Sequence, residues 1–227
     1  MGSNIDQALG RINFFFHRTL RSLIVRSPRY LGNIDAWFLK QYLLHLNLKN
    51  VSSIPTHTSK RELAALFNLA IDCQAKAIAL EIGSYLGASA CYLAAGLARV
   101  NGHLYCVDSW QNETMPEGER DTYHEFLSNT CVLQPWITPL RKHSETLSGS
   151  DLQLPLRLAF IDGDHSYASV REDFQRILPW MAEDGIVAFH DANRTFEGVT
   201  RVIGEALASG DWAVAGMVES LTWLKRN

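Results

Sequence analysis

The sequence predicts an α/β protein built on a mostly parallel, doubly wound sheet. Short apolar runs alternate with helical segments from residue 60 onward, which is the pattern of parallel strands joined by crossover helices. The last two runs, 212–218 and 220–225, are separated by Glu219 alone, and so short a connection requires an antiparallel pair. With the five earlier strands, they predict a seven-stranded sheet that ends in this pair.

The composition is that of an ordinary globular protein. The 227 residues are 47% hydrophobic and 20% charged, which fits one α/β domain with an extension. The net charge of −3 gives no reason to expect nucleic acid as a partner. We expect no transmembrane segment, because no apolar run is long enough. We also expect a cytoplasmic location, because no signal peptide is recognisable and the four cysteines lack CxxC spacing.

Residues 1–50 differ from the rest in charge, with seven Lys/Arg against two Asp/Glu. Apolar side chains recur at helical spacing in 5–25 and again in 34–48. We expect a helical extension that packs on its own domain or forms a homo-oligomer, with an anionic membrane surface as the alternative. The polar segment 51–58 places the boundary, so that residues 51–227 form the main domain.

A glycine-rich turn follows the first strand of that domain. Ser59 and Glu62 match a capping box and start the helix that precedes the strand, 78–82. The segment after the strand leads directly into a second helix, and this arrangement points backbone N–H groups and a helix N-terminus at a ligand. We therefore expect a nucleotide-like cofactor to contact the following residues: Glu81, Gly83, Ser84, Tyr85, Gly87 and Ser89.

The second strand, 104–108, ends in Asp108, which follows Gly87 by 21 positions. That spacing is near the one at which an acid meets ribose hydroxyls in dinucleotide-binding folds, and a helix cap is the alternative role. Ser109 and Trp110 follow, and the indole could stack on a cofactor base or simply pack in the core. The polar segment 109–130 is either a loop over the substrate or an ordinary surface loop. After the third strand, Ser144 could bond a base edge or cap a helix.

Polar side chains cluster after the fourth and fifth strands, 156–161 and 185–189. Asp162, Asp164 and His165 follow the first of these, and His190-Asp191 follows the second. Oxygen ligands of this kind suit Mg²⁺, so Asp162, Asp191 and His190 form a candidate metal site. Helix capping is the alternative for Asp164 and Ser166, and a buried histidine satisfied by a carboxylate is the alternative for His190.

These motifs together resemble the class I S-adenosylmethionine-dependent methyltransferases. The resemblance covers residues 56–227 and rests on E-I-G-S-Y-L-G at 81–87, on Asp108 and on F-I-D-G-D-H-S-Y at 160–167. It is strongest with small O-methyltransferases and macrolide-sugar methyltransferases. It implies a Rossmann-like sheet, a glycine turn around the methionine part of the cofactor, and contacts from Asp108 to the ribose and from Asp162 to the cofactor.

The resemblance also implies the chemistry. The expected reaction is methyl transfer to a hydroxyl of a small molecule or sugar, with His165 or His190 as the base and Asp162 beside it. Metal-dependent relatives bind Mg²⁺ through the acids that Asp162 and Asp191 match, but here Ala192 replaces the usual asparagine. An NAD-dependent oxidoreductase is a rival that the G-x-x-x-G spacing disfavours, and a non-catalytic cofactor-binding partner protein is another.

Overall fold

The computed structural model describes residues 32–48, 50–113 and 118–227. The chain divides into two units, 1–45 and 46–227. The described part of the first unit is one helix, α2 (Gly32–His45), whereas the helix predicted at 5–25 lies outside the described residues. The predicted homo-oligomer through this extension stays a prediction. None of the described helices is long and apolar enough to cross a membrane.

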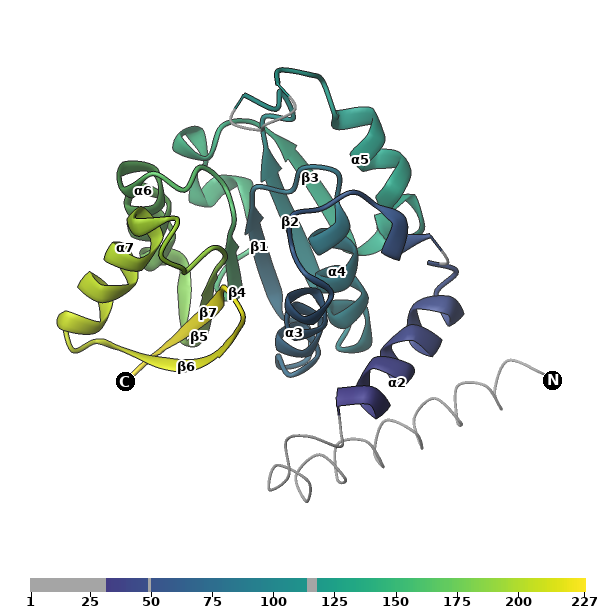
Figure 1. Ribbon diagram of the computed structural model, residues 1–227, viewed down its shortest axis with the longest axis horizontal. Helices are drawn as coiled ribbons and strands as arrows, with labels where there is room; N and C mark the ends of the chain where they lie inside the picture. Colours follow the sequence, from purple (N-terminus) through teal and green to yellow (C-terminus); the bar gives the residue numbers. More distant parts are fainter. Residues whose placement is uncertain (1–31, 49, 114–117) are drawn as a thin grey trace. The chain divides into compact units, whose positions relative to one another are not determined.

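The second unit contains a seven-stranded sheet with the strand order β3-β2-β1-β4-β5-β7-β6 (Figure 1). The first five strands in this order run parallel, and β7 is antiparallel to both of its neighbours. This confirms the predicted architecture and the terminal antiparallel pair. The strands are β1 (Ile78–Ile82), β2 (His103–Asp108), β3 (Ile137–Arg141), β4 (Leu156–Ile161), β5 (Met181–Phe189), β6 (Trp212–Val218) and β7 (Leu221–Arg226).

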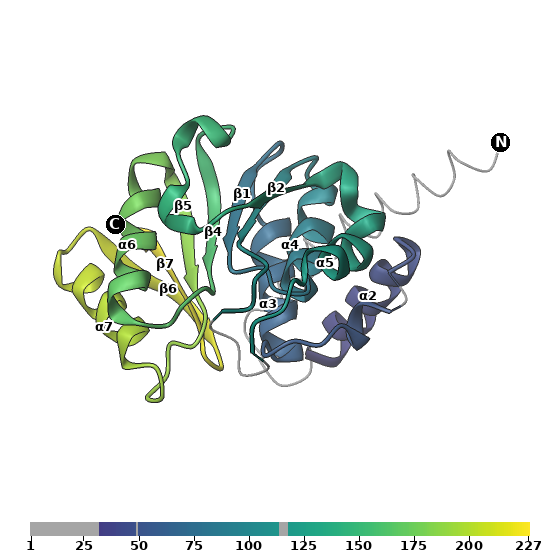
Figure 2. The same cartoon turned by 90° about the horizontal axis from the view of Figure 1, so that it is seen from above.

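Helices cover both faces of the sheet. Figures 1 and 2 both show α3, α4 and α5 on one side and α6 and α7 on the other. Apolar side chains from β1, β4 and β5 pack against α6 and α7 in a continuous core that includes Leu80, Phe174 and Val202. The helices are α3 (Lys60–Ile71), α4 (Ala88–Arg99), α5 (Tyr123–Thr130), α6 (Tyr167–Ile177) and α7 (Glu197–Ala208).

Part of the segment expected to be irregular is helical. Residues 109–130 were expected to be a loop, yet their last third forms α5, with Phe126 and Thr130 buried. The polar side chains hide this helix, because only a narrow apolar face turns inward. The loop description applies only to the residues before the helix.

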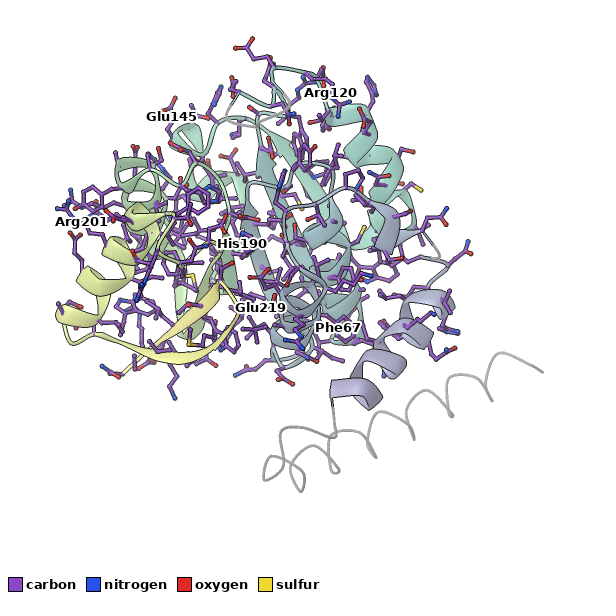
Figure 3. The ribbon with its side chains drawn as sticks, viewed as in Figure 1. Phe67, Arg120, Glu145, His190, Arg201 and Glu219 are labelled. Carbon is purple, nitrogen blue, oxygen red and sulfur yellow. The ribbon has the colours of Figure 1, made fainter. Side chains whose placement is uncertain are left out.

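The small residues of α4 let it lie unusually close to α3. A Cβ added at Gly96 would lie 2.7 Å from the Cβ of Ala70 and 2.7 Å from the carbonyl oxygen of Phe67, which is labelled on α3 in Figure 3. The run of alanines in α4 is fully buried at this contact. Close packing on α4 fixes the position of α3 and, with it, the side chains at the start of α3.

We predict that Gly96→Ala destabilises the protein by about 1–3 kcal/mol despite the higher helix propensity of alanine, because the added methyl group overpacks the contact with α3. Gly204→Ala is the matched control, since it lies inside α7 with no described atom within 4 Å of the added Cβ. The control should stabilise by about 0.5–1 kcal/mol. Chemical denaturation of both variants measures this, and equal effects would contradict the packing argument.

Candidate functional site

The turn after β1 brings the backbone of this strand against the end of β4. Gly83 and Gly87 adopt left-handed backbone angles, each with φ of 87°. A Cβ on Gly83 would lie 2.1 Å from the carbonyl oxygen of Asp162, so any other residue would push the two strand ends apart. At Gly87 the added atom would meet Thr130 of α5 at 2.8 Å. The two glycines therefore allow a narrow cradle that side chains would otherwise fill.

Asp108 holds this turn in place from the end of β2. Its Oδ2 atom accepts hydrogen bonds from the backbone amides of Ser84 and Tyr85, both at 2.8 Å, and its Oδ1 atom accepts one from the Trp110 amide at 2.6 Å. A carboxylate has about four acceptor positions, and three are used here. One acceptor position of Asp108 thus remains for the proposed hydrogen bond from a ribose hydroxyl. The other three give Asp108 a structural role that the sequence did not reveal.

Trp110 is the one predicted cofactor contact that we withdraw. The side chain is fully buried, its indole N–H donates to the carbonyl oxygen of Tyr85 at 2.9 Å, and its ring packs against Tyr123 and Phe126. The chain turns through a left-handed angle at this residue, with φ of 53°, which directs the ring toward α5. Trp110 therefore packs in the core, which was the alternative role, and we no longer expect it to stack on a cofactor base.

The serines predicted at the cofactor have mixed surroundings. Ser84 and Ser89 are buried in the glycine turn and the first turn of α4. Ser109 donates to Glu113 at 3.0 Å. Ser144 is the first residue of a 3₁₀ helix, and it also hydrogen-bonds Asp173. Their contacts with a cofactor remain predictions.

Glu81 is fully buried beneath the glycine turn. Its Oε2 atom accepts a hydrogen bond from Ser84 Oγ at 2.7 Å, whereas its Oε1 atom has no partner of hydrogen-bond geometry within the described residues. Burial raises the pKa of this carboxyl to about 7, although the nearby polar side chains of Ser89, Ser84 and Cys106 lower it in part. An acceptor without a donor in the protein interior is costly, and a donor from a ligand would relieve that cost.

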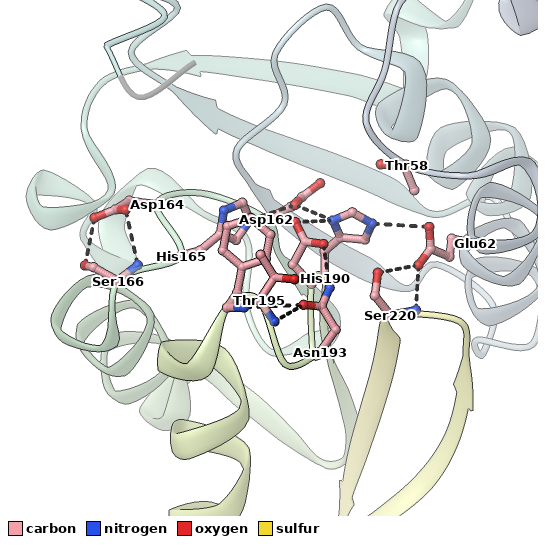
Figure 4. A network of polar contacts seen from close by, with 12 residues as sticks. Thr58, Glu62, Asp162, Asp164, His165, Ser166, His190, Asn193, Thr195 and Ser220 are labelled. Carbon is pink, nitrogen blue, oxygen red and sulfur yellow. Dashed lines mark hydrogen bonds and ion pairs between the residues drawn. The ribbon is translucent and has the colours of Figure 1, made fainter. Parts of the chain in front are cut away.

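The tips of β4 and β5 carry a compact cluster of four side chains. Asp162, His165, His190 and Asp191 each offer one ligand atom, and these atoms lie within 4.8 Å of one another (Figure 4). The cluster forms because β4 and β5 are parallel neighbours, as expected from their order in the sequence. The capping alternative is confirmed for Ser166, whose side chain accepts a hydrogen bond from the Ser169 amide at the start of α6. Asp164 lies apart from the cluster and accepts hydrogen bonds from the Ser166 and Ser169 hydroxyls, so it supports the cap without being the cap itself.

His190 is almost completely buried and surrounded by carboxylates. Its Nδ1 atom lies 3.0 Å from Asp162 Oδ1 and 3.4 Å from Asp191 Oδ2, and its Nε2 atom lies 3.3 Å from Glu62 Oε2. Burial alone lowers the pKa of the imidazole, but hydrogen bonds and charge interactions with Asp162 and Asp191 outweigh it and raise the pKa to about 11. The surrounding carboxylates therefore favour the protonated form of the His190 ring.

Glu62 is the member of this network that the sequence missed as a site residue. The capping box itself is confirmed, since Ser59 and Glu62 satisfy each other's backbone donors. Nothing in that local motif indicates a contact with a histidine 128 positions later. Most glutamates at the start of a helix are exposed, so a buried one indicates a further role. That indication is available only once the burial is known.

His165 lies at the more open side of the cluster. Its side chain is 28% exposed and its ring packs on Phe196, with ring centroids 4.5 Å apart. Its Nε2 atom lies 3.3 Å from Asp191 Oδ2 and 3.5 Å from Asp162 Oδ1, and it has no hydrogen-bond partner of good geometry in the described part of the chain. Burial lowers the pKa of His165, but the contact with Asp162 and the charge of Asp191 outweigh this effect, so the pKa lies above its usual value.

The cluster fits a divalent cation. Two ligand atoms about 2.1 Å from one ion and at right angles to each other are about 3 Å apart, close to the separations found here. The Nε2 atom of His190 faces a carboxylate, which is one of the partners that the non-ligating nitrogen of a metal-bound histidine commonly has. Two carboxylates with imidazole suit Mn²⁺, Fe²⁺ or Zn²⁺ better than Mg²⁺, which prefers oxygen ligands.

A family model described as a methyltransferase domain matches residues 80–192, from β1 through the end of β5. Solved structures agree over a longer part of the chain. A protein from Staphylococcus aureus, provisionally described as a caffeoyl-CoA O-methyltransferase, matches 86% of this chain and 96% of its own with a TM-score of 0.62 and 13% identity.

Two further structures come from biosynthetic enzymes. The O-methyltransferase TomG of Streptomyces achromogenes, solved with S-adenosylmethionine, has a TM-score of 0.56 and 17% identity over 92% of this chain and 94% of its own. CalS11, a TDP-rhamnose 3'-O-methyltransferase of calicheamicin biosynthesis, has a TM-score of 0.56 and 15% identity over 91% of this chain and 98% of its own. At these identities the likeness concerns the fold.

We predict that Glu81→Gln stabilises the ligand-free protein at alkaline pH and has a much smaller effect at acid pH. A carboxyl whose pKa rises from 4.5 to about 7 on folding makes stability fall as the pH increases between these values. The neutral amide avoids that loss, which is on the order of 3 kcal/mol at pH 8. Thermal unfolding at pH 5 and pH 8 measures the difference, with the exposed Glu183→Gln as control, and a gain independent of pH would contradict the burial argument.

Proposed function

The chain belongs to the class I S-adenosylmethionine-dependent methyltransferases, and we propose that it methylates a hydroxyl group of a small molecule or sugar with the help of a divalent cation. The observation that carries this proposal is the position of the carboxylate–histidine cluster. Asp162 contributes to the cluster and also abuts Gly83 of the glycine turn through its backbone. A methyl donor in the turn and an acceptor at the cluster would therefore be neighbours.

The glycine turn is suited to the methionine part of the cofactor. Its two glycines keep the cradle open, and the unpartnered Oε1 of Glu81 lies beneath it. Asp108 retains one acceptor position for a ribose hydroxyl. S-adenosylmethionine supplies a methyl group on a sulfonium, which is already a good leaving group. The protein then mainly aligns the acceptor oxygen with that methyl group and removes its proton.

We assign the metal ligands to Asp162, Asp191 and His190. A bound cation would lower the pKa of a nearby hydroxyl, which is the chemistry that an alcohol acceptor requires. Three carboxylates, including Glu62, surround His190, so the site carries more negative than positive charge until a cation enters. We prefer Mn²⁺ or another transition metal to the Mg²⁺ expected from the sequence, because an imidazole replaces an oxygen ligand.

His165 is our candidate for the base. Its Nε2 atom faces the cluster with no hydrogen-bond partner of good geometry in the described residues, and a cation on Asp162 and Asp191 would weaken their hold on its proton and make it available as a base. His190 is less suitable, because it is 3% exposed and both ring nitrogens face carboxylates. Asp162 and Asp191 would stabilise the imidazolium that forms on His165.

An open surface depression begins at Ala192, immediately after Asp191, and continues along the first turns of α7. We propose that the acceptor approaches the cluster from this side. The enzymes of similar fold include one described as acting on a caffeoyl-CoA and one on a TDP-linked rhamnose, and acceptors of these kinds are suitable first substrates to try.

We predict that the protein binds S-adenosylhomocysteine, and that methylation of a panel of sugars, phenols and acyl thioesters requires a divalent cation. Removal of metal by a chelator, or Asp191→Asn, should lower kcat/KM on the order of 10³-fold, because Lewis-acid stabilisation contributes several kcal/mol. Asp164→Asn is the control, since Asp164 only bonds the start of α6. Calorimetry that finds tight binding of NAD and none of S-adenosylhomocysteine would overturn the assignment.

We predict separately that His165→Ala lowers kcat by about 10²–10⁴-fold while the affinity for S-adenosylhomocysteine stays the same, because the variant lacks only the base. His143→Ala, at a histidine that pairs with Glu113 at the surface, serves as the control. Single-turnover kinetics with saturating cofactor measure the chemical step. Unchanged turnover in His165→Ala eliminates this residue as the base.

A further inference from the structure

Glu62 joins three segments that are far apart in the sequence. It lies at the start of α3, is 3% exposed, and uses both carboxylate oxygens. Its Oε1 atom accepts hydrogen bonds from the backbone amide of Ser220 at 2.9 Å and from Ser220 Oγ at 2.7 Å. Its Oε2 atom accepts one from the Ser59 amide at 2.8 Å and lies 3.3 Å from His190 Nε2 (Figure 4).

These contacts determine which way the imidazole of His190 points. Backbone amides can only donate, and one of them bonds each oxygen of Glu62, so both oxygens act as acceptors. The Nε2 atom of His190 must then carry the proton in its contact with Glu62. With that edge fixed, the opposite edge presents Nδ1 to Asp162 and Asp191.

A capping role alone does not require this arrangement. The capping box needs only the contact with Ser59, and an exposed glutamate would satisfy it. Here the same side chain also binds the turn between β6 and β7, whose Ser220 carbonyl oxygen accepts a hydrogen bond from the Ala192 amide at 2.8 Å. The turn is further tied to α3 by contacts of Glu219 with Ser59 and Arg61. Both flanks of Asp191 are therefore anchored through Glu62 or its partners.

We propose that Glu62 is a positioning residue, which orients the ring of His190 by accepting a hydrogen bond from Nε2 and so directs Nδ1 into the cluster with Asp162 and Asp191. The inference deepens the proposed function and rests on it, because that edge of the ring is where a metal would bind. Glu62 precedes the segment 80–192 that matches the family model, so the role is carried by this chain's own helix α3.

Glu62→Gln is the decisive variant. A carboxamide has only one oxygen, so it places an NH₂ group against either the Ser220 amide or the pair formed by the Ser59 amide and His190. Ser59→Ala is the matched control, because it removes half of the capping box and the contact with Glu219 but keeps the contact between Glu62 and His190. Both variants lose part of the support at the start of α3, so a purely structural role would affect them alike.

Nitrogen-15 NMR of the histidine side chains in the full-length, metal-free protein reads the ring directly. The His190 signals are assigned by their loss in His190→Gln. We expect a slowly exchanging Nε2 proton in the wild type and in Ser59→Ala, and its loss or rapid exchange in Glu62→Gln. Even if Glu62→Gln does not fold, a wild-type His190 that lacks a proton on Nε2 overturns the proposal.

Titration with Zn²⁺, followed at the same His190 signals, adds the link to the metal. We expect the Nδ1 signal to shift while the Nε2 proton is retained, with about 10–100-fold weaker binding in Glu62→Gln and unchanged binding in Ser59→Ala. If no variant responds to Zn²⁺ but the Nε2 proton depends on Glu62, the positioning role stands and the proposed metal site fails. Identical spectra and affinities in the two variants overturn the positioning role.

Discussion

The buried imidazole of His190, held among carboxylates, is the interaction on which this site depends. Moving a charged ring out of water is unfavourable unless partners compensate it, and Glu62, Asp162 and Asp191 together provide that compensation. Removing one partner would leave a charge buried without its counterpart, which typically costs several kcal/mol. The segments that carry these residues, α3, β4 and β5, are thus linked by electrostatics as well as by packing. The same excess of carboxylates that stabilises His190 makes the cluster attractive to a cation.

A second constraint is the close approach of the glycine turn to the end of β4. Gly83 permits a backbone contact that any side chain would prevent, and Asp108 holds the turn through hydrogen bonds from three amides. The glycine turn and the carboxylate–histidine cluster therefore meet at the carboxyl ends of the strands, where open α/β sheets bind their ligands. This explains why Asp108 resembles a ribose-binding acid and yet spends most of its acceptor capacity on the protein.

The fold could be predicted because it depends on patterns that are local in the sequence. Alternating apolar runs and the single-residue gap at Glu219 led to the correct sheet, and the order of β4 and β5 brought Asp162 and Asp191 together as expected. For Trp110 the sequence left stacking and core packing both open, because its position after Asp108 says nothing about which way the ring turns, and the structure shows packing. The helix α5 was missed for a similar reason, since Phe126 is the one buried apolar residue of this otherwise polar helix.

The sequence by itself determined the α/β class, the terminal antiparallel pair and the identities of the acids at the ends of the fourth and fifth strands, because strand-end positions follow directly from chain connectivity. Only the tertiary structure decided the surroundings of His190 and Glu81, the loss of Trp110 to the core and the participation of Glu62. The physical reason is that burial and hydrogen-bond partners arise between segments, here across 128 positions from α3 to the end of β5, and no local pattern records which distant group will occupy the other side of a contact.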